Sequence, residues 1–238
     1  MILPKLSLTK PSLTFLLCYS PPSSLLPLSL SLSTLGGDWG IRRAGLLHFE
    51  GTERVNVSGS TFYRTDANSI MISGYNRNAT VADCEFAYIG MSAVVTYGRC
   101  KQDDCTGGQQ PWGTVLAYNK IHEIGAYQLQ SSFWFISKAA LTRSEGNVIF
   151  NIPRAAINFN DAMAGAGHNV TLQSIWNTCR QSGDHGPMNS WDRLPGLNML
   201  ASNGVTPSYN ASLTETTHSM IIANYGAVSL FSILSFLT

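Results

Sequence analysis

The chain has 238 residues, of which 44% are hydrophobic and 12% are charged, and its formal net charge at pH 7 is +1. This length is enough to bury one elongated core. The sequence contains no run of Lys and Arg of the kind that binds phosphate backbones, which argues against a nucleic-acid partner. Neither end carries the roughly 20 consecutive apolar residues of a spanning helix, so we expect no stable membrane span.

Residues 1–35 form a leader that is rich in Leu, Ser and Pro and has no acidic residue. Its apolar run from Leu13 to Cys18 follows Lys5 and Lys10, the order found in the basic and apolar regions of a signal peptide. Prolines interrupt this pattern. Two interpretations therefore stay open: a signal peptide, which would make the protein secreted or bound at the cell surface, and a disordered leader without a targeting role.

From residue 55 onward, one pattern returns along the chain: alternating apolar residues, a small or polar residue, and then an apolar anchor. Successive anchors are separated by 24, 35, 28 and 26 residues. The anchors are Phe62, Phe86, Ile121, Ile149 and Ile175.

A second short alternating run lies between anchors, at residues 69–73, 92–96 and 155–159. Several short strands per repeat without helical periodicity are typical of a parallel β-helix. The sequence thus predicts an all-β protein, a solenoid of about six to seven coils, with residues 36–226 as a single β-helix domain. We expect it to be a monomer.

Five cysteines are present, and two of them flank a four-residue segment inside the longest repeat. A disulfide between Cys100 and Cys105 would close this insertion in an oxidising compartment. The alternative is a metal site, but no His lies near and the spacing is not that of a zinc knuckle, so we expect no metal. Cys84 and Cys179 fall within or beside strands, where we expect buried apolar thiols.

Four sequons would accept N-glycans if the chain entered a eukaryotic secretory pathway. Asn, Ser and Thr are also common in β-helix turns, so composition alone can produce such sequons. The four acceptors are Asn56, Asn78, Asn169 and Asn210.

Charged residues are scarce in this chain, but residues 182–193 hold two Asp, a His, an Arg, an Asn and a Trp. Their sequence is Ser-Gly-Asp-His-Gly-Pro-Met-Asn-Ser-Trp-Asp-Arg. A cluster of ionisable and hydrogen-bonding side chains beside an aromatic ring favours a site for a polyhydroxylated ligand. Upstream lies its expected partner, residues 158–161 with the sequence Asn-Phe-Asn-Asp. Asp161 and Asp184 are 23 residues apart, which is close to one repeat.

The repeat and the block at residues 182–193 together resemble the right-handed parallel β-helix, pectate-lyase-like superfamily, over roughly residues 36–226. The resemblance implies a right-handed coil and a carbohydrate-active protein whose partner is a polysaccharide or other glycan. It also implies further coils beyond Gly226, whereas residues 227–238 form a short apolar tail. Two interpretations follow: a C-terminally truncated or misassembled gene product, or a solenoid whose apolar tail caps the open end.

Equivalent residues in successive coils lie about 4.8 Å apart, so a carboxylate pair one coil apart fits the retaining geometry of glycoside hydrolysis. We assign Asp161 as nucleophile and Asp184 as acid/base, with Asp192 as a substitute in the second role. His168, His185, Asn189, Trp191 and Arg193 are the candidate substrate-binding residues. A hydrolase of this kind needs no cofactor.

Three alternatives remain open. A polysaccharide lyase would use His185 or Arg193 as base and could require Ca²⁺. A non-catalytic glycan-binding or cell-surface β-helix would need the binding residues alone. Finally, Asp and Asn side chains often cap turns by bonding backbone amides, which would give the whole block a structural role.

Overall fold

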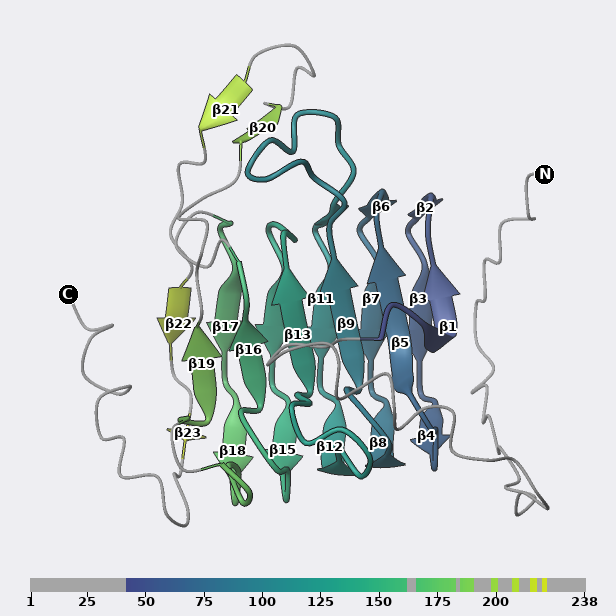
Figure 1. Ribbon diagram of the computed structural model, residues 1–238, viewed down its shortest axis with the longest axis vertical. Coiled ribbons are helices and arrows are strands. Elements are labelled where there is room, and N and C mark those ends of the chain that lie inside the picture. Colours follow the sequence, from purple (N-terminus) through teal and green to yellow (C-terminus); the bar gives the residue numbers. More distant parts are fainter. Residues whose placement is uncertain are drawn as a thin grey trace.

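A computed structural model describes residues 42–161, 166–182 and 185–190, together with the strand residues 198–200, 207–209, 215–217 and 220–221. In this part of the chain all regular secondary structure is β-strand. The strands stack into parallel sheets, each coil adding one strand to each of the three main sheets, and the protein is a parallel β-helix (Figure 1). Its coils advance across the figure from the N-terminal strand β1 toward β22 and β23.

Three six-stranded sheets form the walls, which gives six coils. Sheet A contains β1 (Gly45–Phe49), β5 (Asn68–Ser73), β9 (Val94–Tyr97), β13 (Trp134–Ser137), β16 (Ile157–Phe159) and β19 (Met188–Ser190). Sheet C contains β3 (Asn56–Ser58), β7 (Thr80–Ala82), β11 (Val115–Ala117), β14 (Arg143–Glu145), β17 (Asn169–Thr171) and β22 (Glu215–Thr217). Sheet D contains β4 (Thr61–Tyr63), β8 (Glu85–Ile89), β12 (Lys120–Ile124), β15 (Val148–Phe150), β18 (Ser174–Trp176) and β23 (Met220–Ile221).

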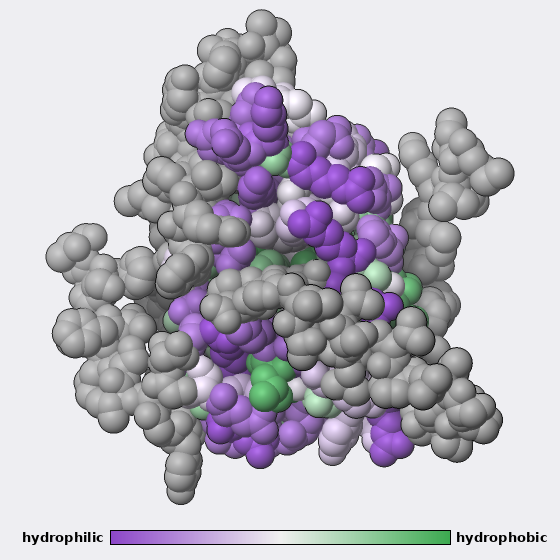
Figure 2. All heavy atoms as spheres, viewed as in Figure 1, coloured by the Kyte–Doolittle hydropathy of each residue, from purple (hydrophilic) through white to green (hydrophobic). Residues whose placement is uncertain are grey.

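Two smaller sheets complete the fold. Sheet B joins A to C in the first three coils and contains β2 (Thr52–Glu53), β6 (Asn76–Arg77) and β10 (Pro111–Trp112). An antiparallel pair is formed by β20 (Asn198–Leu200) and β21 (Pro207–Tyr209). Figure 2 shows hydrophilic residues over the turns at both ends of this face of the molecule and small hydrophobic patches between them.

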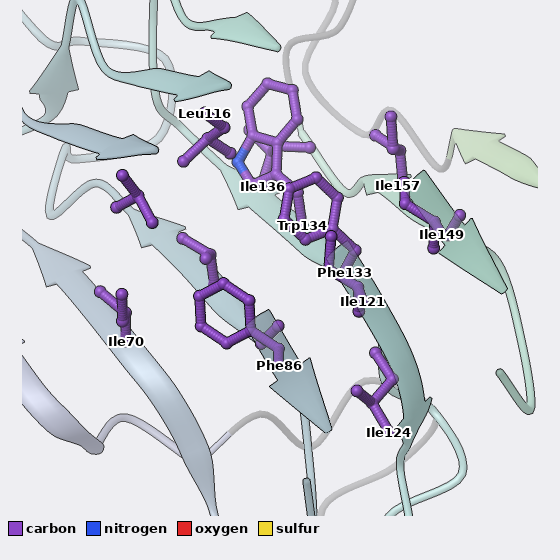
Figure 3. Packing of buried hydrophobic residues seen from close by; sticks show 14 of the residues in the cluster. Ile70, Phe86, Leu116, Ile121, Ile124, Phe133, Trp134, Ile136, Ile149 and Ile157 are labelled. Carbon is purple, nitrogen blue, oxygen red and sulfur yellow. The ribbon is translucent and has the colours of Figure 1, made fainter. Parts of the chain in front are cut away.

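The predicted anchors form one ladder on the inner face of sheet D. Phe62 pairs with Phe86, and the register continues through the three isoleucines to Ile221. The five anchors are at most 1% exposed. They pack against the inner residues of sheet A, including Ile70, Trp134 and Ile157 (Figure 3). The repeat read from the sequence is thus confirmed as the coil of the solenoid.

The corner between sheets C and D turns in the same way in the first five coils. The residue after each of these five sheet C strands has a positive φ between 54° and 63°, a conformation that costs side-chain-bearing residues free energy. This repeated left-handed residue directs the chain from one wall to the next. The corner residues are Gly59, Asp83, Tyr118, Gly146 and Leu172.

The residue after this corner is the small or polar residue of the sequence pattern. In the third to fifth coils it is Asn119, Asn147 and Gln173, whose side chains form a buried hydrogen-bonded ladder. The Asn119 backbone N–H and its Nδ2 both donate to Asn147 Oδ1, at 3.0 Å each. Asn147 Nδ2 in turn donates to Leu116 O at 2.9 Å and lies 3.2 Å from Gln173 Oε1. Each amide therefore satisfies polar groups of the neighbouring coil that would otherwise be buried without partners.

We expect Asn147→Ala to lower the free energy of unfolding by about 2 kcal/mol, because it removes the side-chain partner of the buried Asn119 backbone N–H and of the Leu116 carbonyl. Urea denaturation followed by circular dichroism measures the change. Asn56→Ala, at an exposed position of β3, is the matched control and should shift stability by less than about 0.5 kcal/mol. Equal losses in both variants would contradict a role for the ladder.

Candidate functional site

One outward row of sheet A begins with the exposed His48 in the first coil and then changes from apolar to polar along the solenoid. The outward positions are in register from coil to coil, because they alternate with the core residues on each strand. In the second to fourth coils they are apolar, and in the fifth and sixth they are asparagines. The row runs Met71, Val95, Phe135, Asn158 and Asn189.

The two asparagines form the centre of the polar part. Asn189 Nδ2 donates to Asn158 Oδ1 at 2.7 Å, and Asn158 is 0% exposed. Within the described residues, the Nδ2 group of Asn158 has no hydrogen-bond partner. A buried amide donor without a partner costs about 1–3 kcal/mol, so this group is suited to a ligand oxygen.

Asp161 lies at the edge where the sheet A strands end. Ser137 Oγ, one coil earlier, lies 3.2 Å from the Asp161 carboxylate, and Asp161 is 3% exposed. The neighbouring Asn160 is also buried, and its backbone N–H donates to Ile136 O at 2.9 Å. The end of β16 therefore holds one carboxylate in a defined orientation beside the outer face.

His185 lies near the opposite edge, where the sheet A strands begin. Arg154 Nη2 lies 2.5 Å from its Nε2, and Ser182 Oγ lies 2.9 Å from its Nδ1. Because a guanidinium can only donate, Nε2 must accept and the proton of the neutral ring must be on Nδ1. This contact positions the imidazole as a neutral group, with both nitrogens engaged.

The structure places His168 inside the solenoid and not on the outer face. The Thr142 backbone N–H donates to its Nδ1 at 3.3 Å, and its ring lies edge-on to Trp134 at 5.3 Å. Burial lowers the pKa of His168 to about 3, so the ring is neutral at physiological pH. The sequence analysis placed His168 among the substrate-binding residues, whereas in the structure its side chain is buried and does not lie on the outer face.

The register between the fifth and sixth coils determines whether Asp161 and Asp184 occupy equivalent positions of neighbouring coils. Asn158 pairs with Asn189, and these two residues are 31 positions apart. The 23-residue spacing from Asp161 to Asp184 is therefore not one coil at this point of the solenoid. Four of the predicted site residues lie outside the described residues: Asp184, Trp191, Asp192 and Arg193.

Cys100 and Cys105 form a disulfide in the long turn between β9 and β10. Arg77 holds the end of this turn, donating to Gly108 O and Gln110 O. Cys84 and Cys179 are buried, as the sequence predicted. In the described part of the chain, no group of three or more His, Cys, Asp or Glu side chains could hold a metal ion. The described ranges also hold no helix that is long and apolar enough to cross a membrane.

The predicted glycan acceptors differ in exposure. Asn56, on β3, and Asn78, at the corner before sheet C, are exposed, which N-glycosylation requires. Asn169, at the start of β17, is half-buried. Asn210 lies outside the described residues.

Sequence reasoning missed Ser137 and Ser182, which contact Asp161 and His185. Serine is common throughout this chain, and only the coil register connects these two residues to the site.

Comparisons with protein-family models, with curated proteins and with solved structures find no match. The assignment to the parallel β-helix class therefore rests on the strand order and the register.

Proposed function

We propose that this protein is a carbohydrate-active β-helix protein that binds a neutral or lightly charged polysaccharide across the outer face of β16 and β19 and hydrolyses its glycosidic bonds. The observation that carries the proposal is the paired row of Asn158 and Asn189, with Asp161 at its end. Amide groups beside a carboxylate suit a polyhydroxylated ligand, because they donate to and accept from hydroxyl groups. The sequence resemblance to pectate-lyase-like β-helices supports the same class of ligand.

We infer that the second carboxylate is Asp192. Continuing the register of Asn158 and Asn189 by three residues pairs Asp161 with Asp192. Residues paired in this way lie about 4.8 Å apart at the backbone, which suits the separation of about 5–5.5 Å between the carboxyl groups of retaining glycosidases. Asp184 precedes β19 by four residues and belongs to the other edge of the sheet in this assignment.

In this mechanism Asp161 attacks the anomeric carbon as the nucleophile while Asp192 gives its proton to the departing glycosidic oxygen. Asp192 then removes a proton from water, and this water displaces Asp161 from the sugar with overall retention. Ser137 orients the nucleophile through its hydrogen bond. His185 is an unfavourable base for the lyase alternative, because Arg154 already occupies its Nε2.

Single substitutions in the full chain test the assignment against a panel of neutral and acidic polysaccharides. We expect Asp161→Asn and Asp192→Asn each to reduce the release of reducing ends at least about 100-fold, because each removes one half of the acid–nucleophile pair. Asp103→Asn, in the exposed disulfide loop, is the matched control and should retain full activity.

Other outcomes distinguish the alternatives. Loss of activity in Asp184→Asn but not in Asp192→Asn would overturn the proposed pair. An unsaturated product formed only from uronate polymers would indicate a lyase. The burial of Asp161 also fits a structural turn, and glycan binding without hydrolysis that survives Asp161→Asn would establish a non-catalytic binding protein instead.

A further inference from the structure

The apolar part of the outer face of sheet A is buried, although it lies on the solvent side of the solenoid wall. Met71, Val95 and Phe135 are 0%, 0% and 2% exposed and form a cluster separate from the core. Tyr97 is the partly buried hydrophobic residue that packs against them. An apolar surface of this kind needs a cover, because exposed it would favour association with other apolar surfaces.

The first described residues lie against this same face. In Figure 1 the segment that leads into β1 crosses in front of β5 before it enters the sheet. Asn68 Nδ2, at the start of β5, donates to Arg42 O at 2.7 Å and to Ala44 O at 2.9 Å and so fixes the backbone of the entry segment to the second coil. The Arg43 guanidinium carbon lies 4.3 Å from the centre of the Tyr97 ring, a cation–π contact on the outer face. The Arg43 side chain therefore reaches the outer face beside the apolar cluster.

The segment before Arg42 contains a row of apolar side chains of about the same length as the apolar cluster. Residues 28–33 read Leu-Ser-Leu-Ser-Leu-Ser, a strict alternation that puts the three leucines on one face of an extended segment. Leu28 and Leu32 would be about 13 Å apart in such a segment. The row from Met71 to Phe135 crosses three strands and spans about 10 Å. Glycines at positions 36, 37 and 40 allow a turn before Arg42.

We propose that residues 28–35 pack across the outer faces of β5, β9 and β13, with Leu30 at the centre against Val95, as an intramolecular cover. The proposed cover lies over β5, β9 and β13 and does not extend over the asparagine row of β16 and β19. Any signal peptidase cleavage compatible with the cover lies before Leu28. This proposal is independent of the chemistry assigned to Asp161.

Thiol labelling in the full chain tests the cover. A thiol introduced by Val95→Cys, with Cys18→Ser to remove the leader thiol, should react with a maleimide at least about 100-fold more slowly in the native protein than after denaturation. Cys84 and Cys179 are buried and provide the internal reference for intact folding. Leu30→Asp should raise the labelling rate of the introduced thiol at least about tenfold by displacing the cover.

Ser31→Asp is the matched control: it adds the same charge one residue further, on the opposite face of the segment, and should leave the rate unchanged. If Val95→Cys prevents folding, binding of a hydrophobic dye to Leu30→Asp and Ser31→Asp in the otherwise unaltered chain replaces the labelling readout. Rapid labelling with the leader intact, or equal effects of Leu30→Asp and Ser31→Asp, would overturn the proposal. Protection that rises with protein concentration would identify a second copy of the chain as the cover and would also overturn it.

Discussion

Phe86→Ala is expected to lower the free energy of unfolding by about 4 kcal/mol. The Phe86 ring is 0% exposed and stacks on Phe62, with ring centroids 4.7 Å apart and planes 4° apart. Removing it leaves a cavity in the anchor ladder between Phe62 and Ile121, and the hydrogen-bonded strands on both sides limit the collapse of that cavity. A loss of this size is a large share of the stability of an ordinary domain.

Chemical denaturation of the wild type and the variant measures this effect. Tyr88→Ala is the matched control, because Tyr88 is on the same strand β8 but is 49% exposed, and we expect a loss below about 1 kcal/mol. Phe86→Leu, which keeps most of the volume, should cost less than half as much as Phe86→Ala. If Tyr88→Ala and Phe86→Ala destabilised equally, the anchor ladder would not be the main source of packing in sheet D.

The second large effect is a loss of stability on acidification that comes from His168. Burial lowers its pKa from 6.5 to about 3 in the folded protein, so the unfolded chain binds a proton there at a higher pH than the folded chain does. The contribution is complete above pH 6.5 and falls as the pH drops toward 3. Each pH unit in this window costs about 1.4 kcal/mol, which amounts to about 2 kcal/mol at pH 5.

Denaturation at pH 7, 6 and 5 of the wild type and of His168→Asn isolates this contribution. The Asn Oδ1 can accept the hydrogen bond from the Thr142 N–H but does not titrate, so the variant should lose about 2 kcal/mol less than the wild type between pH 7 and pH 5. Glu85, whose pKa is lowered chiefly by its hydrogen bond from Lys120, acts below about pH 4.5 and does not enter this window. Parallel pH profiles for the two proteins would show that His168 titrates normally.

The candidate site was only partly predictable from the sequence. Asn158, Asp161, His185 and Asn189 were identified as chemistry-bearing residues, and the structure brings Asn158 and Asn189 into contact on one face. His168 lies seven residues after Asp161, and the alternation of β17 turns its ring into the solenoid, toward Trp134. The sequence contained this signal, because His168 is two residues before the inward Val170 and alternate residues of a strand share a face.

The class of fold and the ladder at its centre are predictable from the sequence. A coil that stacks on its neighbours needs an apolar residue at every inward position, so Phe62, Phe86, Ile121, Ile149 and Ile175 mark the repeat whatever the lengths of the turns between them. The tertiary structure alone decided which polar residues become neighbours. Turn length varies from coil to coil, and backbone hydrogen bonding between strands sets the register, so Asn158 meets Asn189 after 31 residues. A spacing counted along the chain cannot supply that number, since insertions in the turns change the spacing without changing the stack.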